Sequence, residues 1–485
     1  MGAAGPTVDP ATGKERDSSK SAFRFKPGDI RSWSDLRHAN VTVFFHWETG
    51  MLRLKSVDEQ TNTVTFTGEF KWPFWGRQRY YVENVFEALD APGEWYLNGV
   101  AGRLYYRPRP GEDMSRAVAI APVLSQLVRL NGTPEQGRFV EHIHFRGLSF
   151  QHAAYALEPE GHADWQAAIT VPAAVDATGA RHCSMLRCEF SRLGGYAVAF
   201  RRGSQHNAIV ENHLYDLGAG GVKIGDEAVP ATENTESGHN EVRSNFIHEI
   251  GRVFYGAIGV WIGQSSDNVI THNEICDTNY TGISCGWTWG YGPTKAHRNR
   301  IEYNYIHHIG PGRLCDMGGI YTLGTSPGTV VRNNLIHDVW DWEEGYGAGG
   351  IYPDEGSSQI LIENNVVYRT ATAGLGVHYG KDNVARNNII ALGRDQQVYL
   401  GRSDKDSSIK FERNIVYYDE GKLFVRESRL EADHNVYWNA RGEPVTFLND
   451  LSWEQWRAKG LDVHSVIADP RFVDARAGDF RLQPD

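Results

Sequence analysis

The sequence lacks the features that mark several protein classes. Its 485 residues include only five cysteines, and no two stand at CxxC spacing, which argues against a disulfide framework and against a cysteine-rich zinc site. No apolar run approaches the ~18 residues typical of a membrane span. Acidic residues outnumber basic ones by 60 to 49 without any basic block. This balance argues against nucleic acid as a partner, because phosphate contacts need clustered Lys and Arg.

The chain also shows no secretory signal peptide at its start. Residues 1–21 are small and polar and contain no apolar h-region, so we interpret them as a flexible lead-in. Residues 22–138 contain alternating strand patterns joined by turn residues, which predict an antiparallel β module. We expect a catalytic solenoid over residues 139–450, and a C-terminal helix and cap over 451–485. The predicted helix runs from about Ser452 to Lys459 and covers the open end of the solenoid.

Glycine and aromatic residues are abundant. The chain has 52 glycines, and 12% of its residues are aromatic, too many for a disordered protein. Glycine excess together with many aromatics and few helical patterns favours one long all-β solenoid over several average domains.

A short repeated phrase organises this solenoid. Asparagine followed by any residue and then an aliphatic one returns at intervals of 21 to 33 residues, at Asn212, Asn245, Asn273, Asn304, Asn334, Asn365, Asn388, Asn414 and Asn435. Glycine-bounded strand patterns stand between these copies. The spacing predicts a right-handed parallel β-helix whose coils stack ~4.8 Å apart. We expect the asparagines to occupy turns, where they tolerate the left-handed conformation and form a ladder along the axis.

Two further columns follow the buried aliphatic residue of each copy. We interpret the first as a stack of turn residues: Tyr215, His248, Cys276, His307, His337 and Tyr368. The second is mostly acidic: Asp216, Glu249, Asp277, His308 and Asp338. Turn capping is the favoured interpretation of the acidic column, and binding of a structural calcium ion is the alternative. Apart from that alternative, no metal or cofactor is expected.

One strand of each coil is expected to present a row of side chains outward. Because a strand alternates faces, the inward residues are expected to be Val222, Val260, Ile283, Ile320, Ile351, Val377 and Val398. The outward row is then Lys223, Trp261, Ser284, Tyr321, Tyr352, His378 and Tyr399. Aromatic rings, a cation and a histidine on one face are typical of the floor of a carbohydrate groove.

Long loops in the central coils carry further aromatic side chains. Trp287, Trp289, Trp342 and Tyr346 lie in loops that exceed the length of a minimal coil. We interpret these rings as surfaces for stacking on sugars. The alternative is that the loops pack on themselves through tryptophan.

Two aspartates of neighbouring coils are the candidate catalytic pair. Asp316 precedes one strand and Asp354 follows the next, and glycoside hydrolysis needs one protonated and one ionised carboxyl group. On straight strands the two would lie far apart, so the pairing requires the segment Asp316–Gly319 to bend. Glu355 and Glu344 are the substitutes if it does not. Because the charge of Glu355 would raise the pKa of its neighbour, we expect Asp354 to be the acid.

The motifs around these aspartates resemble glycoside hydrolase family 141. They are DMGGIYTLG from Asp316, GGIYPDEGSS from Gly349 and ENNVVY from Glu363. The resemblance covers most of the chain and implies a β-helix enzyme acting on plant or algal polysaccharides, with Asp316 and Asp354 as the catalytic pair. It also implies extracellular or periplasmic location, and a natural protein that extends beyond both ends of this chain. The enclosing tryptophan loops favour an exo-acting α-L-fucosidase, with a xylanase or xylosidase of the same family as the alternative.

Two other functions remain open at this point. A β-helix polysaccharide lyase would need a cation beside a uronate, for which Lys223, His378 and Lys381 are available. A carbohydrate-binding solenoid without catalytic activity is the other alternative, since the fold by itself fixes no function. We expect a monomer whose partner is a polysaccharide or oligosaccharide.

Overall fold

In a computed structural model of the chain, residues 2–3, 7–8, 15–402, 407–425 and 429–484 are described. The predicted lead-in, residues 1–21, therefore lies partly outside the described residues. The chain forms two compact units. The first contains residues 1–123 and 155–170, and the second contains residues 124–154 and 171–485.

The first unit is an antiparallel β module. Its main sheet has six strands, in the order β1 (Gly2–Ala3), β4 (Ala22–Arg24), β7 (Thr63–Phe66), β6 (Thr49–Asp58), β5 (Asn40–Phe44) and β8 (Arg79–Glu83). Smaller elements are the pair β2 (Thr7–Val8) and β3 (Glu15–Arg16), the 3-10 turn η1 (Phe86–Ala88), and the hairpin β9 (Trp95–Asn98) and β10 (Arg103–Tyr106). Packed phenylalanines form its core, among them Phe23, Phe45, Phe70 and Phe74. The predicted antiparallel module is confirmed.

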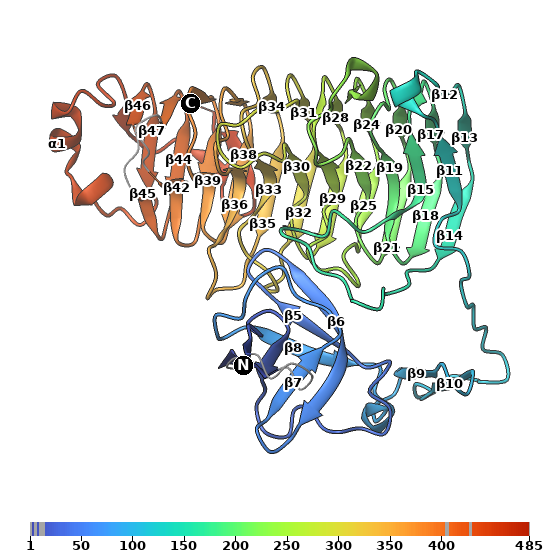
Figure 1. The fold of residues 1–485 in the computed structure, drawn as a ribbon. Coiled ribbons are helices and arrows are strands. Elements are labelled where there is room, and N and C mark those ends of the chain that lie inside the picture. The colour runs from blue at the N-terminus through green and yellow to red at the C-terminus, as the bar shows by residue number, and fades with distance from the viewer. Residues whose placement is uncertain (1, 4–6, 9–14, 403–406, 426–428, 485) are drawn as a thin grey trace. The chain divides into compact units, whose positions relative to one another are not determined.

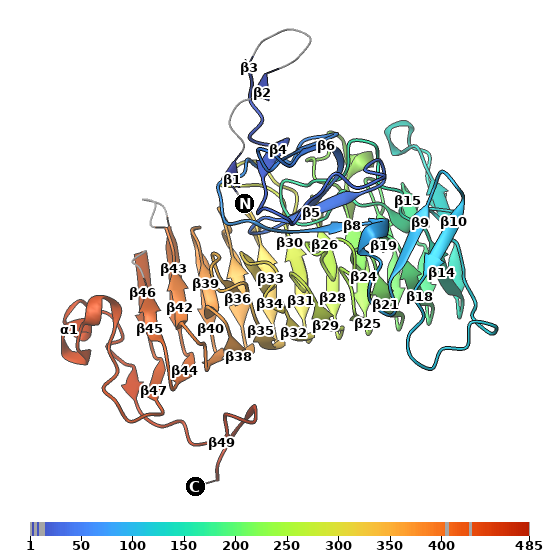
Figure 2. The ribbon, with the colours of Figure 1, turned by 90° about the horizontal axis from the view of Figure 1, so that it is seen from below.

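The second unit is a parallel β-helix built from three long sheets, whose strands stand side by side from coil to coil (Figure 1; Figure 2). The first sheet contains β11 (Val128–Asn131), β15 (Ala173–Thr178), β19 (Tyr196–Phe200), β22 (Val222–Ile224), β26 (Val260–Ile262), β30 (Ile283–Cys285), β33 (Met317–Thr322), β36 (Ala348–Pro353), β39 (Ala373–Val377), β42 (Gln396–Leu400) and β45 (Lys422–Val425). It carries both candidate aspartates at its strand ends.

The second sheet has short strands that follow those of the first. They are β13 (His144–Arg146), β17 (Ser184–Leu186), β20 (Ala208–Val210), β24 (Glu241–Arg243), β28 (Val269–Thr271), β31 (Arg300–Glu302), β34 (Val330–Arg332), β37 (Leu361–Glu363), β40 (Asn383–Arg386), β43 (Ser408–Glu412) and β46 (Arg429–Asp433). The remaining short elements of the β-helix unit are η2 (Pro134–Gln136), η3 (Glu233–Thr235), the parallel pairs β12 (Val140–Glu141) with β16 (Ala180–Arg181) and β23 (Ser237–Gly238) with β27 (Ser265–Ser266), and the hairpin β49 (Phe472–Asp474) and β50 (Asp479–Leu482).

The third sheet completes each coil. Its strands are β14 (Ser149–Ala153), β18 (Glu189–Leu193), β21 (His213–Leu217), β25 (Phe246–His248), β29 (Glu274–Thr278), β32 (Tyr305–Ile309), β35 (Leu335–Val339), β38 (Val366–Thr370), β41 (Ile389–Ala391), β44 (Ile415–Tyr418), β47 (Val436–Asn439) and β48 (Val466–Ile467). The column Tyr215 to Tyr368 lies within these strands, so its interpretation as a stack of turn residues is wrong. Most of these strands continue two residues past this column, as β29 does to Thr278 and β32 to Ile309.

The predicted asparagine ladder is present between the second and third sheets. Each buried amide donates to the side-chain oxygen of the asparagine one coil further on, as from Asn273 to Asn304 at 3.0 Å and from Asn304 to Asn334 at 3.0 Å. The left-handed conformation, however, belongs to the residue before each asparagine. Ser244, for example, has φ 55° and Tyr303 has φ 54°. The sequence therefore predicted the turn correctly, but it assigned the left-handed conformation to the asparagine instead of to the residue before it.

A second ladder joins the first and second sheets. Asn207, Asn240 and Asn268 each donate in the same way to the next member, at 2.9, 3.2 and 2.8 Å, and the ladder ends at Asn299. Sequence reasoning missed this ladder. Its signal was available, because each of these asparagines stands five residues before a member of the first ladder.

A column of glycines lets the core close. A Cβ atom at any of these glycines would lie 2.1 to 3.1 Å from an isoleucine or valine methyl group of the third sheet; they are Gly221, Gly259, Gly282, Gly319, Gly350 and Gly374. Part of the glycine excess therefore reflects the narrow cross-section of the coil.

The helix α1 (Trp453–Ala458) lies where the sequence predicts it, beside the last coil (Figure 1). The 3-10 turn η4 (Leu448–Asp450) precedes it. Ser452 caps the helix by accepting a hydrogen bond from the Gln455 amide, and Trp456 is buried against Phe447 and Phe424.

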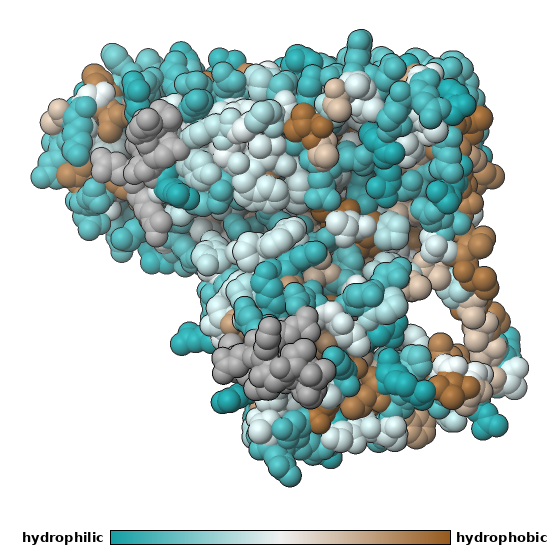
Figure 3. Space-filling model, in the orientation of Figure 1, coloured by the Kyte–Doolittle hydropathy of each residue, from teal (hydrophilic) through white to brown (hydrophobic). Residues whose placement is uncertain are grey.

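No helix among the described residues has the length and apolarity needed to cross a membrane. The visible surface of the solenoid is largely hydrophilic (Figure 3).

Candidate active site

The two candidate aspartates lie at opposite ends of neighbouring strands in the first sheet. Asp316 immediately precedes β33, and Asp354 immediately follows β36. The two strands pair in parallel with Tyr321 opposite Tyr352. A straight pair of strands would therefore separate the aspartates by about 23 Å along the strand direction, since each residue adds ~3.3 Å.

The chain bends between Asp316 and Ile320, and this bend shortens the separation. Asp316 has a left-handed φ of 57°. A Cβ atom at Gly318 would lie 2.9 Å from the Ile320 carbonyl oxygen and 3.1 Å from the Tyr352 Cβ, whereas a straight strand places a residue two positions on at about 6.6 Å. The bend required by the sequence hypothesis is present, and a side chain at Gly318 would obstruct it.

Two tyrosines connect the aspartates in a crossed pattern. The Tyr352 hydroxyl donates to Asp316 Oδ1 at 3.1 Å, and the Tyr321 hydroxyl donates to Asp354 Oδ2. Each tyrosine thus reaches the aspartate of the other coil. The two rings meet edge to face with centroids 5.6 Å apart, which fixes the geometry of the group. The Tyr280 hydroxyl holds the Asp316 carbonyl oxygen at 2.9 Å.

The electrostatic environments of the two carboxyl groups differ. Burial and the negative charge of Asp354 raise the pKa of Asp316 to about 7. Asp354, only 5% exposed, accepts hydrogen bonds from Tyr321 and from His378, whose Nδ1 lies 2.7 Å from Asp354 Oδ1. Asp316 is therefore suited to donate a proton, and Asp354 is the second carboxyl group of the pair, held in place by two hydrogen-bond donors.

This arrangement favours the opposite of the acid assignment expected from sequence. The charge of Glu355 contributes to raising the pKa of Asp316 and of His378, and its carboxylate accepts a hydrogen bond from the Tyr379 hydroxyl at 2.9 Å. Burial acts to lower the pKa of His378, but the hydrogen bond and the charge of Asp354 raise it overall. His378 thus holds the Asp354 carboxyl group in place through the contact between Nδ1 and Oδ1.

His378 reaches Asp354 because its place in the sheet differs from the prediction. Leu375, and not Val377, pairs with Ile351 and Val398, so Gly376 takes the position next to Tyr352 and Tyr399. His378 follows β39 as Asp354 follows β36. The sequence prediction aligned Val377 and His378 with Ile351 and Tyr352, which is two residues too far along the strand. Because side chains alternate faces with a period of two, this error leaves the predicted inward and outward faces unchanged.

The remaining predicted row is in register from Lys223 through Trp261, Ser284 and Tyr321 to Tyr352. Lys223 is buried, donates to the Val171 carbonyl oxygen at 2.6 Å and lies over the Tyr196 ring. Trp261 Nε1 and Ser284 Oγ are buried and have no hydrogen-bond partner among the described residues. The row therefore contains two unsatisfied polar atoms, on β26 and β30, the two strands that precede β33 in the first sheet.

The tryptophan loops serve partly as packing. Trp287 is buried against Trp261, with ring centroids 5.5 Å apart, and Trp289 contacts Trp287 but stays 47% exposed. Trp342 is half-buried, and Tyr346 is 67% exposed. Glu344 is exposed on the same loop. Packing within the loops thus accounts for Trp287, while Trp289 and Tyr346 have solvent-exposed side chains.

The loop of Trp289 approaches the turn after Asp354 closely. The Gly290 amide donates to the Glu355 carbonyl oxygen at 3.3 Å, and a Cβ atom at Gly356 would lie 2.2 Å from the Gly290 carbonyl oxygen. Only a glycine fits at Gly356, whose φ is 76°. This contact connects the tryptophan loop to the segment that carries Asp354.

Three groups of described residues place His, Cys or carboxylate atoms close enough together to hold a metal ion. They are Glu274 with Cys276 and His307, His308 with His337 and Asp338, and Asp433 with His434 and His464. None of the three groups includes Asp316 or Asp354. The acidic column has left-handed φ values of 49° to 54°, so these residues mark a bend at the end of the third-sheet strands. Calcium binding by that column stays a prediction.

Comparison with known proteins supports the fold. The family described as a right handed beta helix region matches residues 259–436. The chain is a right-handed parallel β-helix. Among solved structures it is similar to a glycoside hydrolase, with a TM-score of 0.63 and 25% identity over 73% of this chain and 66% of that chain.

Two further similarities are weaker. The complex of XylC with xylose has a TM-score of 0.43 at 13% identity, covering 93% of this chain and 71% of that chain. The uncharacterized protein YwoF of Bacillus subtilis (strain 168) is 26% identical over 190 residues, which are 35% of this chain and 39% of that protein. The chain thus spans less than half of this curated relative. The family match and the similarity to the solved glycoside hydrolase support a β-helix of glycoside-hydrolase-like type, without singling out family 141 or an α-L-fucosidase.

Proposed function

We propose that this β-helix is a glycoside hydrolase in which Asp316 is the general acid and Asp354 is the nucleophile or general base. The observation that supports this most directly is the crossed pairing of the two aspartates with Tyr352 and Tyr321, together with the raised pKa of Asp316. The raised pKa of Asp316 suits it to the acid role, and glycosidic bond cleavage requires a second carboxyl group, for which Asp354 is the candidate.

In the proposed reaction, Asp316 gives its proton to the glycosidic oxygen as the bond to the anomeric carbon breaks. The Asp354 carboxylate either attacks that carbon directly or removes a proton from an attacking water molecule. In the first route a covalent sugar ester forms, and water then hydrolyses it with Asp316 acting as base. The anomeric configuration of the first-formed sugar distinguishes retention from inversion.

Substrate binding is proposed along the row from Trp261 to Tyr352. The hydroxyl groups of a sugar in contact with this row would serve as hydrogen-bond partners for Trp261 Nε1 and Ser284 Oγ, which have none among the described residues. The exposed ring of Trp289 is available for stacking on a sugar face. We retain Lys223, Trp287, Tyr321, Trp342, Glu355 and His378 as predicted binding residues, with His378 and Tyr321 acting through Asp354.

For the substrate itself we propose a terminal α-L-fucosyl residue of a plant or algal glycan. This rests on the resemblance of the two aspartate motifs to family 141 and on the tryptophan loop held against the Asp354 turn. Xylan and aryl β-xyloside are the competing substrates. Secretion and a monomeric state stay predictions.

A screen with aspartate variants tests the proposal. Purified protein is assayed on aryl α-L-fucoside, aryl β-xyloside and xylan. Asp316→Asn is expected to lose about 10²–10⁴-fold in rate on unactivated glycosides, and less on aryl glycosides whose leaving group needs no proton. Asp354→Asn is expected to lose activity on both. Glu241→Gln, a change in a surface ion pair with Arg243, is the control and should match wild type.

Full activity in both aspartate variants would reject the proposed pair. A different outcome would be an unsaturated uronate absorbing in the ultraviolet after incubation with pectin or alginate, which would identify a lyase. The contacts favour hydrolysis over this alternative, because His378 pairs with Asp354 and Lys223 donates to a backbone carbonyl.

A further inference from the structure

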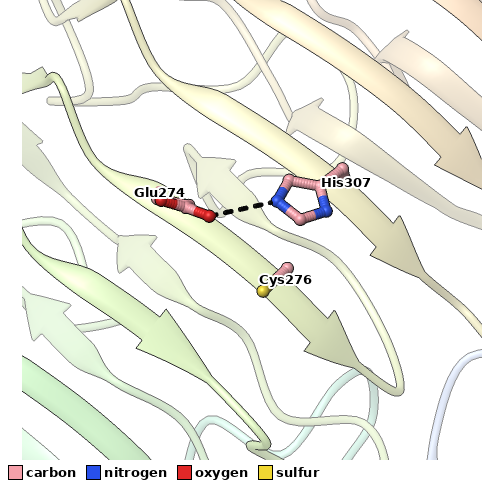
Figure 4. Close-up of side chains that lie close together, drawn as sticks. All are labelled: Glu274, Cys276 and His307. Carbon is pink, nitrogen blue, oxygen red and sulfur yellow. Dashed lines mark hydrogen bonds and ion pairs between the residues drawn. The ribbon is translucent and has the colours of Figure 1, made fainter.

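A mixed cluster of ligand-type side chains lies on the third sheet, away from both aspartates. Glu274 and Cys276 belong to β29, and His307 belongs to β32, one coil further on (Figure 4). Cys276 pairs in register with His307, and Glu274 points from the same strand toward the imidazole. The ligand atoms of the three residues all lie within 4.8 Å of one another.

The atoms of this cluster suit a borderline transition metal. A thiol sulfur, an imidazole nitrogen and a carboxylate oxygen are the three donor types that Zn²⁺ accepts, whereas calcium and magnesium prefer oxygen ligands only. Glu274 Oε1 lies 3.4 Å from His307 Nε2, a separation that a shared ion bound at about 2 Å from each can span.

The surroundings of His307 match those of a metal-bound histidine. Its Nδ1 lies 2.7 Å from His308 Nδ1, so one of the two nitrogens must donate a hydrogen bond. If His307 carries its proton on Nδ1 and donates, its Nε2 is free to coordinate a metal on the side facing Glu274. Metal-ligating histidines usually donate their second ring N–H in this way.

Local charge and access also favour a cation. The Asp277 carboxylate lies 3.4 Å from the Cys276 sulfur and adds negative charge beside the cluster. Cys276 is 4% exposed, but the Glu274 side chain is 47% exposed, so the cluster opens to solvent on the Glu274 side.

The neighbouring group of His308, His337 and Asp338 is less suitable. Asp338 already accepts two hydrogen bonds from the Arg369 guanidinium, at 2.8 and 2.7 Å. A cation bound there would face this positive charge. The third group, around Asp433, is open to solvent, with side-chain exposures of 33%, 49% and 66% for Asp433, His434 and His464.

We propose that Glu274, Cys276 and His307 form a Zn²⁺ site that ties two adjacent coils together, with water as the remaining ligand. The absence of CxxC spacing does not exclude this site, because the solenoid supplies ligands from successive coils that are 31 residues apart in sequence. His307 lies on the strand that leads into the loop before Asp316, so the ion would anchor the base of that loop.

Metal titration of the full chain tests the proposal. Protein treated with chelator is titrated with Zn²⁺ and separately with Co²⁺, and binding is followed by calorimetry, by the thermal midpoint and by thiolate-to-cobalt charge-transfer absorption. One ion per chain is expected to bind with a rise in thermal midpoint. The charge-transfer band reports a sulfur ligand and does not depend on hydrolytic activity.

The variants locate the site. Cys276→Ser should abolish the charge-transfer band, and His307→Gln should weaken Zn²⁺ binding by at least about tenfold. His272→Gln, an exposed histidine outside the cluster, and His464→Gln, in the solvent-open group, are the controls and should bind as wild type does. Circular dichroism and the metal-free thermal midpoint establish that each variant is folded.

Two results would overturn the proposal. One is the absence of saturable Zn²⁺ binding at micromolar concentration in the folded wild type. The other is binding that persists unchanged in folded Cys276→Ser and His307→Gln but is lost in His464→Gln, which would place the ion at the group around Asp433.

Discussion

At the scale of single residues, the candidate active site depends on two carboxyl groups of the same type in different surroundings. Asp316 is held by one tyrosine beside the negative charge of Asp354, while Asp354 receives a tyrosine and a histidine. Asp316 has a left-handed φ of 57°, a conformation that it shares with turn residues of other coils such as Ser244 and Tyr303. The chemistry therefore follows from partners that neighbouring coils supply.

The pH dependence of activity should report the pKa of Asp316. Since the acid must be protonated, kcat/KM should fall as the pH rises through about 7. The hydrogen bond from Tyr352 favours the ionised carboxylate and so lowers the pKa of Asp316. Tyr352→Phe should therefore move the basic limb of the profile to higher pH, by roughly half to one unit.

The control for this measurement is Tyr303→Phe, a change at an exposed tyrosine on the outside of the coils. Its profile should coincide with that of wild type. A basic limb that stays in place in Tyr352→Phe, or moves to lower pH, would contradict the assignment of Asp316 as the acid.

At the scale of elements, two asparagine ladders and a column of glycines determine how the sheets join. Each ladder amide satisfies backbone groups at a buried turn that water does not reach, and each glycine lets the first sheet approach the third. Sequence reasoning identified the first ladder because its asparagines precede aliphatic residues. The second ladder was missed although its asparagines stand five residues before members of the first.

A central rung of the first ladder should be important for stability. Asn304 donates to Asn334 Oδ1 and to the Ile270 carbonyl oxygen, and it accepts from the backbone and side-chain nitrogens of Asn273. Asn304→Ala removes these bonds and leaves their partners buried. We expect the free energy of unfolding to fall by about 3–5 kcal/mol, measured by chemical denaturation.

Tyr303→Ala is the matched comparison, since it changes the adjacent exposed residue in the same turn. Its effect should stay within about 1 kcal/mol. Equal losses for the two variants would show that the ladder contributes no more than the turn itself.

At the scale of the whole molecule, the solenoid is a stack in which each coil contacts only its neighbours. The stability of such arrays is close to a sum of local terms, and the end coils are the weakest. The last coil is covered by α1, where Trp456 packs on Phe447 and donates to Asp462 Oδ2 at 2.8 Å. The cap therefore protects one end without contributing to the candidate active site.

Removal of this cap contact should loosen the C-terminal coils alone. Trp456→Ala is expected to lower the free energy of local opening around β44 and β47 by about 3–5 kcal/mol, seen as faster amide hydrogen exchange there. Exchange in β33 and β36, and kcat, should stay at the wild-type level. The control is Lys459→Ala, which changes an exposed residue at the end of α1 and should leave hydrogen exchange as in wild type. Faster exchange throughout the solenoid in Trp456→Ala would contradict the expectation that the effect is local.

The sequence by itself determined the solenoid, the first ladder and the terminal helix, and it predicted the pair of aspartates. These features depend on local patterns that repeat along the chain, such as Asn212 to Asn435, and a repeated pattern can be detected without knowing which coil lies beside which. The identity of the aspartates came from motifs, and their pairing required a bend that the sequence permitted but did not establish.

Only the tertiary structure decided the partners of these residues. Three contacts depend on the register between coils whose loops differ in length. They are the contact of His378 with Asp354, the crossed hydrogen bonds of the two tyrosines, and the pairing of Cys276 with His307. The pKa of Asp316 likewise depends on burial and on a charge from the next coil. Register and burial are properties of chain segments distant in sequence, so local patterns fixed the fold while contacts between coils fixed the proposed chemistry.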